Sequence, residues 1–393
     1  MQCSGCGKGS VIMGHTILTI NPGMTGTKIG VVKNGEVILD LNVLNEEADF
    51  SDCASFADQA PFREKLILEK LKENGIDIHE IDAISGRGGG QLPCEGGTYQ
   101  VTDLVYDHAS RDLQKINHPT ILGSVIGYRM SKEFGIPAFF VDPNNTDELC
   151  DEARMTGVKG LYRRARSHML NQRQVAINHS KKMGREYKES NYVVVMMGSG
   201  ISINAHCHGR VIDGTRAGDG QAPISPTRTG DLCAADVFTL LDRGKSLEEI
   251  YNLMSKCGGF DDLLGTHDLK KVSGELVASG DRKAKLAWHA MEYGFVKWIA
   301  TMAGALKGKV DGILLTGGLA YDKSLTDRIR EDTQWIAPVY VYPGSFETEA
   351  LAAGAERVLS GEETAKVYRG EEGMWKGFGI PEWEKDLTIA DFV

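Results

Sequence analysis

Residues 17–40 read ILTINPGMTGTKIGVVKNGEVILD: an apolar strand, a turn rich in glycine and threonine, a second strand, and an Asn34-Gly35 turn into a third. Residues 193–213, VVVMMGSGISINAHCHGRVID, repeat this order and have turns of their own at the matching places. Gly23 and Gly198, in the first turn of each copy, are 175 residues apart, and Gly35 and Gly209, in the second turn of each copy, are 174 apart. The two copies therefore differ by one residue in loop length. Such a repeat indicates an internal duplication. Two small-residue turns that face each other across a cleft would offer N–H groups to a polyphosphate from both sides.

Length and charge narrow the class of protein. A chain of 393 residues is too long for one ordinary core, which favours about two domains and agrees with the duplication. Hydrophobic residues make up 41% and charged residues 25%, typical of a globular protein with no low-complexity tract. The net charge of −10 argues against nucleic-acid or anionic-membrane binding.

Cysteine usage and the N-terminus point to the cytoplasm. Of the eight cysteines, only Cys3 and Cys6 have C-x-x-C spacing, and a zinc site would need two more ligands. The others are typical of buried small hydrophobic residues in a reducing compartment. The N-terminus has no apolar signal segment, and no apolar run approaches the length of a membrane span. We therefore expect a cytoplasmic protein.

Residue patterns predict alternating strands and helices. A helix over 61–73 has Phe62, Leu66, Ile67 and Leu71 at helical spacing. Thr146 is expected to cap a further helix that begins at Asp147. The other strands are predicted at 15–20, 28–33, 36–42, 81–85, 138–141, 312–316 and 339–342, and the other helices at 121–133, 168–183, 284–306 and 347–359.

The first turn, residues 21–28, is not a P-loop, because the G-x-x-x-x-G-K spacing is absent and a strand follows it. Thr25 and Thr27 supply hydroxyls, and Lys28 either reaches toward a phosphate or points to solvent. Taken alone, such a turn is more often a plain hairpin. Its recurrence at 198–200 favours a pair of phosphate-binding turns.

Arg87 and Arg228 are the candidate anion-binding residues. Arg87 lies in a glycine-rich stretch after a strand, at the edge where α/β proteins usually bind ligands. Arg228 lies in a loop of small residues, PTRTGD, and a guanidinium there can bind two carboxylate or phosphate oxygens. The alternative is a surface arginine that caps a loop.

Other candidate positions have two interpretations each. Asp142 could bind magnesium or orient a substrate, or it could start an Asp-Pro turn. His168 could donate to a phosphoryl group or serve the structure. The pair Gly317-Gly318 could admit a ring or ribose, or allow close packing. Glu347 could cap a helix or lie near magnesium.

The ordered motifs together resemble the butyrate kinase branch of the acetate kinase family over about residues 15–360. The motifs are NPG-x-T-x-TK, GRGGG with EGGTY, VDP, SHMLNQ, GSGISI, VIDG with P-x-R-x-GD, LLTGGLAYD and YPGSFE-x-EALA. Their order is more specific than any one of them.

The resemblance implies an α/β fold in which two duplicated RNase H-like domains flank a nucleotide-binding cleft. Residues 1–14 would form an N-terminal extension. The N-terminal domain would span 15–145 and be completed by 347–393, and the C-terminal domain would span 146–346. The family favours dimers or larger assemblies, so a homo-oligomer is expected.

The resemblance also implies reversible phosphoryl transfer from ATP to a short-chain carboxylate, with butyrate favoured and ADP and an acyl phosphate as products. The catalytic residues would be Arg87, Asp142, His168 and Arg228. The nucleotide would be bound by Asn21, Thr25, Thr27, Lys28, Gly198, Ser199, Gly200, Gly317 and Gly318, and Mg²⁺ would lie near Asn21 and Glu347.

The chain departs from the family pattern at three positions. Related enzymes usually carry serine or threonine where this chain has Met24 and Gly26, and often histidine where it has Met196. Donors that meet developing charge can each contribute a few kcal/mol. The alternative function is therefore a degenerate paralogue that binds nucleotide or acyl phosphate with little turnover and acts as a partner or regulator. A chaperone- or actin-like ATPase is less favoured.

Overall fold

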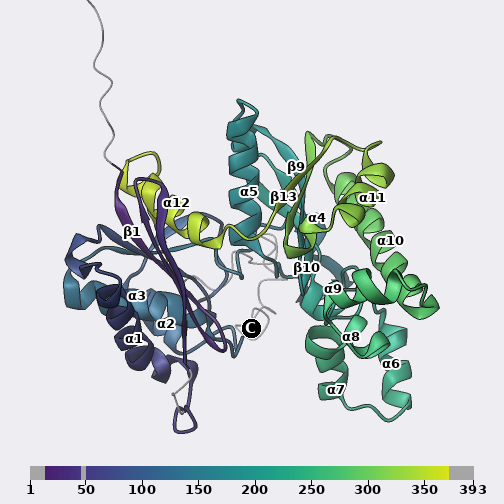
Figure 1. Cartoon of the computed structure of the whole chain (residues 1–393), viewed down its shortest axis with the longest axis horizontal. Coiled ribbons are helices and arrows are strands. Elements are labelled where there is room, and N and C mark those ends of the chain that lie inside the picture. Colours follow the sequence, from purple (N-terminus) through teal and green to yellow (C-terminus); the bar gives the residue numbers. More distant parts are fainter. Residues whose placement is uncertain (1–13, 46–49, 371–393) are drawn as a thin grey trace, which may run out of the picture.

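The computed structural model describes residues 14–45 and 50–370 and consists of two halves, each built on one sheet (Figure 1). The first sheet has the order β14-β5-β6-β4-β1-β2-β3. Its strands are β1 (Thr16–Pro22), β2 (Gly26–Lys33), β3 (Glu36–Leu44), β4 (Ala83–Arg87), β5 (Thr98–Gln100), β6 (Ala138–Val141) and β14 (Lys366–Val367).

The second sheet has the order β11-β10-β9-β12-β13. Its strands are β9 (Asn191–Met197), β10 (Ile201–Cys207), β11 (Arg210–Gly214), β12 (Gly312–Gly317) and β13 (Val339–Pro343). The apolar runs 193–195 and 313–315 are fully buried, as expected for parallel strands covered on both faces.

The two sheets confirm the predicted duplication. The order β3-β2-β1-β4-β6 matches β11-β10-β9-β12-β13, and in both sets two antiparallel pairs are followed by two parallel pairs. The second turns also match. Asn34 and Gly35 have φ of 54° and 81°, and His208 and Gly209 have φ of 47° and 82°. These left-handed pairs are the geometry that joins two strands in a tight hairpin.

Helices cover both faces of each sheet. On the first sheet, α1 (Ala60–Glu73) and α3 (Leu122–Phe134) bury the main core, while α12 (Glu347–Leu359) covers the other face. On the second sheet, α10 (Arg282–Ala305) and α5 (Met169–Lys182) take these places. The remaining helices are α2 (Asp103–Ser110), α4 (Asp151–Arg154), α6 (Ala234–Asp242), α7 (Leu247–Asn252), α8 (Phe260–Leu264), α9 (Leu269–Lys271) and α11 (Lys323–Thr333).

Helices α5 and α12 pack against each other between the halves (Figure 1). The chain therefore crosses from one half to the other twice. It passes once between β6 and α5, and once between β13 and α12. The first crossing reaches α5 after α4 and a short hairpin, whereas the second leads directly into α12, and each of these two helices covers the sheet of its own half.

Three sequence-based expectations need correction. The chain at 147–148 is not helical, because both acidic side chains are buried in ion pairs, and α4 begins only at Asp151. Phe62 is 37% exposed and does not join the core. The strand expected at 81–85 is β4, which begins and ends two residues later.

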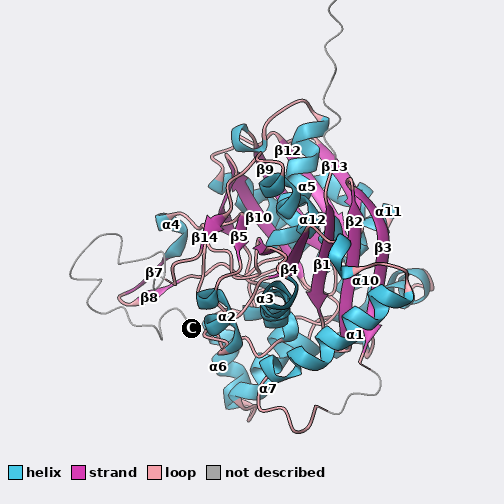
Figure 2. Ribbon diagram, turned by 90° about the vertical axis from the view of Figure 1, so that its left-hand side faces the viewer, coloured by secondary structure: helices cyan, strands magenta, loops and turns pink. Residues whose placement is uncertain are grey.

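Two other expectations lie partly or wholly outside the described residues: the Cys3/Cys6 pair, and most of the tail beyond Gly361. Several elements were not expected, and one of them stands apart from both sheets. The short hairpin β7 (Met155–Val158) and β8 (Leu161–Tyr162) projects from the body of the protein (Figure 2). Its apolar side chains Met155, Val158 and Leu161 are exposed.

Candidate active site

Three predicted residues of the first half form one cluster. Asn21 near the end of β1 and Arg87 at the end of β4 are neighbours, because Ile20 pairs with Gly86 in these parallel strands. Arg87 Nη1 donates to Asn21 Oδ1 at 3.3 Å and to Glu347 Oε1 at 3.1 Å. Asn21 Nδ2 donates to the other oxygen of Glu347 at 2.8 Å.

Glu347 is the first residue of α12, where a carboxylate interacts favourably with the helix dipole. Its ion pair with Arg87 is only about one-fifth exposed at either side chain. The cluster is therefore a partly desolvated group of opposite charges at the C-terminal edge of the first sheet, where the sequence predicted ligand binding.

The second half contributes His168 and Arg228. His168 immediately precedes α5, and its Nδ1 lies 2.8 Å from the hydroxyl of Ser202. Burial, together with the nearby charges of Arg228 and Arg87, lowers the pKa of His168 to about 4, and the charge of Glu347 opposes this effect. The charges of Arg87 from the first half and Arg228 from the second half therefore both act on His168. The structure thus brings these three predicted residues together.

The two turns have the same backbone closure. Gly23 N donates to Gly26 O at 2.7 Å, and Gly198 N donates to Gly200 O at 3.1 Å. The registers place one more residue in the first turn than in the second, as the offsets predicted. The tips are exposed: Met24 and Thr25 in the first turn, and Ser199 in the second.

Two predicted nucleotide-binding residues lie elsewhere. Thr27 is 1% exposed and lies beneath the first turn, where its hydroxyl accepts from Arg63 Nη1 at 3.1 Å. Lys28 points to the opposite face of β2 and pairs with Asp40 of β3 at 3.2 Å. In this conformation Thr27 supports the turn from below, and Lys28 lies along the sheet.

Gly26 has a steric reason to lack a side chain. A Cβ atom there would lie 2.6 Å from the carbonyl oxygen of Val43 and 3.2 Å from Leu44 Cα, both in the backbone of β3. A serine or threonine at this position would therefore not fit without movement of β3. Gly200 is constrained differently, because a Cβ there would collide with the guanidinium of Arg228.

Asp142 lies in a buried ion-pair cluster at the first crossing. Its Oδ1 is 3.0 Å from Arg173 Nε and accepts from Gly97 N at 2.7 Å. Arg173 also pairs with Glu148 at 3.1 Å, and all three side chains are nearly inaccessible. Burial raises the pKa of Asp142, and the charge of Arg173 opposes this effect. Asp142 therefore holds the crossing segment and the EGGTY loop.

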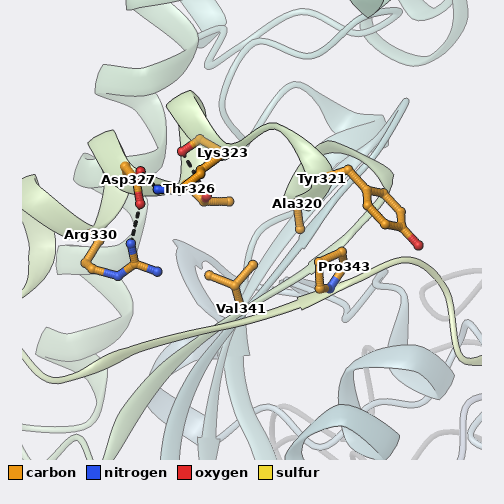
Figure 3. A pocket seen from close by; sticks show the side chains of 8 residues that line it. All are labelled: Ala320, Tyr321, Lys323, Thr326, Asp327, Arg330, Val341 and Pro343. Carbon is orange, nitrogen blue, oxygen red and sulfur yellow. Dashed lines mark hydrogen bonds and ion pairs between the residues drawn. The ribbon is translucent and has the colours of Figure 1, made fainter.

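Gly317 and Gly318 follow β12. Gly317 has φ of 97° and lies against the backbone of Met197, so close packing alone requires this glycine. Gly318 is exposed and faces open space. A pocket of about 270 Å³ lies just beyond the pair, between α11 and β13 (Figure 3). It is lined by Ala320, Tyr321, Lys323, Thr326, Asp327, Arg330, Val341 and Pro343.

Sequence reasoning missed two buried supports of the site. Asn171 on α5 accepts from Phe346 N at 2.8 Å, which fixes the residue before Glu347, and donates to Thr316 and to the sulfur of Met196. Arg63 on α1 lies beneath the first turn. A signal for Arg63 did exist, because it stands four residues before Ile67 and so interrupts the buried stripe of the helix.

The family resemblance implies Mg²⁺, and the donor chemistry near the first turn fits it. Magnesium is usually bound by one or two carboxylates together with phosphate oxygens and water. Glu347 supplies one carboxylate, and Asn21 supplies an amide oxygen beside it. Within residues 14–45 and 50–370 there is no cluster of three or more acidic, histidine or cysteine ligands, which such a shared site does not need.

Comparison with known proteins settles the class. The family model described as the acetokinase family matches residues 156–363, and the chain belongs to that family. Two curated relatives, each named "Probable butyrate kinase" and from two strains of Clostridium botulinum, are 43% and 42% identical. The matches cover 91% of this chain and all of each relative.

Solved structures agree with this fold. The crystal structure of Porphyromonas gingivalis acetate kinase matches 88% of this chain and all of that chain, with a TM-score of 0.73 and 18% identity. A propionate kinase from Francisella tularensis matches 86% of this chain and 98% of that chain, with a TM-score of 0.69 and 17% identity. These confirm the predicted duplicated α/β architecture. Among the described residues, no helix is long and apolar enough to span a bilayer.

Proposed function

We propose that this protein is an ATP-dependent kinase of short-chain carboxylates, with butyrate favoured, and that it forms an acyl phosphate and ADP reversibly. One observation carries the proposal. Arg87 and Glu347, which form an ion pair in the first half, and Arg228 of the second half all lie close enough to His168 to influence its imidazole. Membership of the acetokinase family and the names of the curated relatives support the same reaction class.

Alignment and charge neutralisation carry the reaction in this proposal. A carboxylate oxygen attacks the γ-phosphorus of ATP, and the bond to the bridging oxygen breaks as ADP leaves. Because the carboxylate is already ionised at neutral pH, no strong general base is needed. Arg87 and Arg228 hold the carboxylate and phosphoryl oxygens, which is the main task in phosphoryl transfer.

His168 acts as a neutral hydrogen-bond donor in this scheme. Its lowered pKa keeps the ring uncharged at neutral pH. Ser202 occupies Nδ1, so Nε2 is the nitrogen available to the cleft. A neutral imidazole that donates from Nε2 can stabilise an equatorial phosphoryl oxygen without pairing permanently with the Glu347 carboxylate.

Mg²⁺ would be held near Asn21 and Glu347 and would neutralise charge on the nucleotide phosphates when bound. Arg87 then has a second task, because its contacts hold in place the Asn21 and Glu347 side chains that would bind the metal. Asp142 acts as a positioning residue at the crossing. The exposed tips of the two turns, with Thr25 and Ser199, would face the phosphates.

Further parts of the proposal concern organisation. Residues 15–145 would form one domain, completed by 347–393, and residues 146–346 would form the other. The contacts of α12 with the first sheet and the pairing of β14 with β5 support this division. We propose that the adenosine of ATP lies near Gly317 and Gly318, and that the protein is a cytoplasmic homo-oligomer.

The test is acyl hydroxamate formation from acetate, propionate, butyrate and isobutyrate in the presence of ATP and Mg²⁺. We expect product with all or some of these acids, with the highest kcat/KM for butyrate or its branched analogue. Omission of Mg²⁺ should abolish product. A purified, folded protein that yields no hydroxamate from any of the four acids would contradict the proposal.

Nucleotide binding measured on the same preparation separates the alternative. A rise in melting temperature with ADP or an acyl phosphate, without turnover, would favour the degenerate paralogue. Higher kcat/KM for acetate than for butyrate would retain the reaction class and overturn the substrate.

A further inference from the structure

Arg63 is among the most buried side chains of the described chain and lies directly beneath the first turn. Its exposed fraction is 1%. Nη1 donates to the carbonyl oxygens of Gly23 at 3.0 Å and Gly26 at 3.2 Å, besides the hydroxyl of Thr27. Nε and Nη2 donate to the side-chain oxygen of Gln59 at 3.1 and 2.9 Å. The hydrogen bonds of this guanidinium therefore either hold the turn or join it to Gln59, the residue that precedes α1.

The positive charge of Arg63 has no carboxylate partner among the described residues. Its acceptors are carbonyl, hydroxyl and amide oxygens, and the ring of Phe50 lies 5.6 Å away. The other buried arginines differ: Arg154 is paired with Asp147, and Arg357 is paired with Glu363. Burial lowers the pKa of Arg63 to about 10, so the side chain remains a cation at neutral pH.

A buried cation without a partner is costly unless something else benefits from its charge. The neighbouring arginine, Arg129 of α3, forms the usual arrangement, with Nε 2.5 Å from Glu64. Glu64 is adjacent to Arg63 in sequence, yet it does not neutralise Arg63. Among the residues that the structure describes, no carboxylate takes up the charge beneath the turn, which can therefore act on an anion on the other side of the turn.

The geometry also orients the backbone of the turn. A peptide unit is planar and trans, so its N–H points opposite to its C=O. Arg63 draws the Gly23 carbonyl inward, and the N–H of Met24, which belongs to the same peptide, therefore points outward at the exposed tip. An outward N–H backed by a buried cation is well suited to an anionic phosphate oxygen.

We propose that Arg63 is the positioning residue that shapes the first turn for the phosphates of the nucleotide and supplies the turn with its positive charge. This inference rests on the proposed function, because it takes ATP or ADP as the occupant of the cleft. Arg63 does not touch the substrate and acts through the backbone of Gly23 and Gly26. With this support, the turn can bind phosphate through its backbone even though it has methionine and glycine at positions 24 and 26 in place of hydroxyl residues.

The test compares ADP with adenosine, which lacks phosphate, by isothermal titration calorimetry on the full chain. Arg63→Met removes both the positive charge and the hydrogen bonds to the turn. Arg63→Lys keeps the charge but loses the planar set of guanidinium hydrogen bonds. We expect Arg63→Met to weaken ADP binding about 30-fold or more and Arg63→Lys about 3- to 10-fold. Neither change should alter adenosine affinity. The matched control, Arg129→Met, should leave both ligands unaffected.

Equal losses for ADP and adenosine, or ADP affinity that is unchanged in both variants, would overturn the proposal. If Arg63→Met does not fold, Arg63→Lys decides, with kcat and KM as further readouts. The KM for ATP should rise in that variant, while the KM for the carboxylate should not. A wild-type protein that binds ADP but phosphorylates no carboxylate would contradict the proposed function alone. If the wild type is active and the Arg63 variants bind ADP as tightly as the wild type, the inference about Arg63 is contradicted and the proposed function is not.

Discussion

The two copies of the turn share a backbone plan but differ in how it is held. In the first, the carbonyls of Gly23 and Gly26 are bound from below by the buried Arg63. In the second, the Ser199 carbonyl accepts from two hydroxyls, Ser225 Oγ at 2.8 Å and Thr227 Oγ1 at 3.3 Å. Neutral groups therefore hold the second turn.

The arginine of the second turn has a different place. Arg228 lies against Gly200, where a side chain at position 200 would collide with it, and its Nε donates to Ser255 O at 3.2 Å. One copy thus keeps its cation beneath the backbone, and the other keeps it beside the turn. A duplicated motif can therefore keep the same backbone geometry in both copies while the arginine that provides positive charge occupies a different position in each.

The largest expected effect comes from removing the arginines that lie in the cleft. Arg87→Ala and Arg228→Ala should each lower kcat about 10²- to 10³-fold, because each removes a charge that meets the transferring group. Hydroxamate kinetics with butyrate measure this loss. The control is Arg111→Ala, since that arginine is exposed at the end of α2 and pairs, within the described part of the chain, with Asp107 of that helix. A variant that keeps more than a tenth of wild-type kcat would show that its arginine does not hold the reacting groups.

Alanine in the turns should separate stability from activity. In Gly26→Ala the new methyl group meets the backbone of β3, so we expect a loss of about 1–3 kcal/mol in the free energy of unfolding. In Gly200→Ala it meets the movable end of Arg228, so kcat should fall and stability should change less. Urea unfolding and hydroxamate kinetics measure the two quantities.

The matched controls are Gly23→Ala and Gly198→Ala, whose nearest atoms to a new Cβ lie at 3.4 and 3.6 Å. Both should be milder than the changes at positions 26 and 200. If Gly26→Ala lowers kcat without loss of stability, the contact with β3 is not what makes glycine necessary there.

Acid should destabilise the second half through its buried histidine. Burial lowers the pKa of His206 to about 3, and its ring contacts Tyr187 and Gln172. Below about pH 6.5 the unfolded chain therefore binds a proton that the folded chain does not. Stability should fall as pH decreases from about 6.5 to 3. His206→Gln should reduce the drop in urea midpoint between pH 7 and 4.5, whereas the exposed His267→Gln should not. Equal drops in wild type and His206→Gln would contradict this assignment.

The smallest effect should follow Met24→Ser, at the exposed tip of the first turn. A new hydroxyl there adds one hydrogen bond to a site that already has the Met24 N–H, so the KM for ATP should fall at most about tenfold. Steady-state kinetics at varied ATP concentration measure it. A gain in kcat above tenfold would show that side-chain hydroxyls, and not the backbone and its buried cation, limit the first turn.

Much of the fold was predictable because its signals are local. Helix α12 spans 347–359 as expected, since its acidic first turn and its apolar spacing lie within the segment itself. The duplication was visible because both hairpin turns need residues that tolerate positive φ, and Asn34-Gly35 and His208-Gly209 supply them. The helix expected at Asp147 failed because a tertiary ion pair with Arg154 overrides a local capping signal.

The candidate site was predictable where motifs sit at strand ends, as Asn21 and Arg87 do. Thr27 and Lys28 show the limit. Successive side chains of a strand point to opposite faces, so at most one of the two could face the turn, and the sequence does not say which side is buried. The partners of Asp142 and the acceptors of Arg63 in the first turn are far away in sequence, and no pattern of residue types indicates such pairs.

The position of α12 bears on how the protein is made. Among the described residues, one face of the first sheet is covered mainly by this helix, through contacts such as Ser85 Oγ with Leu351 O at 2.7 Å. At 5–20 residues per second, a ribosome that has completed β6 needs about 10–40 s to reach α12. Throughout that interval the nascent N-terminal sheet has an apolar face in water, so the half that is synthesised first is completed last.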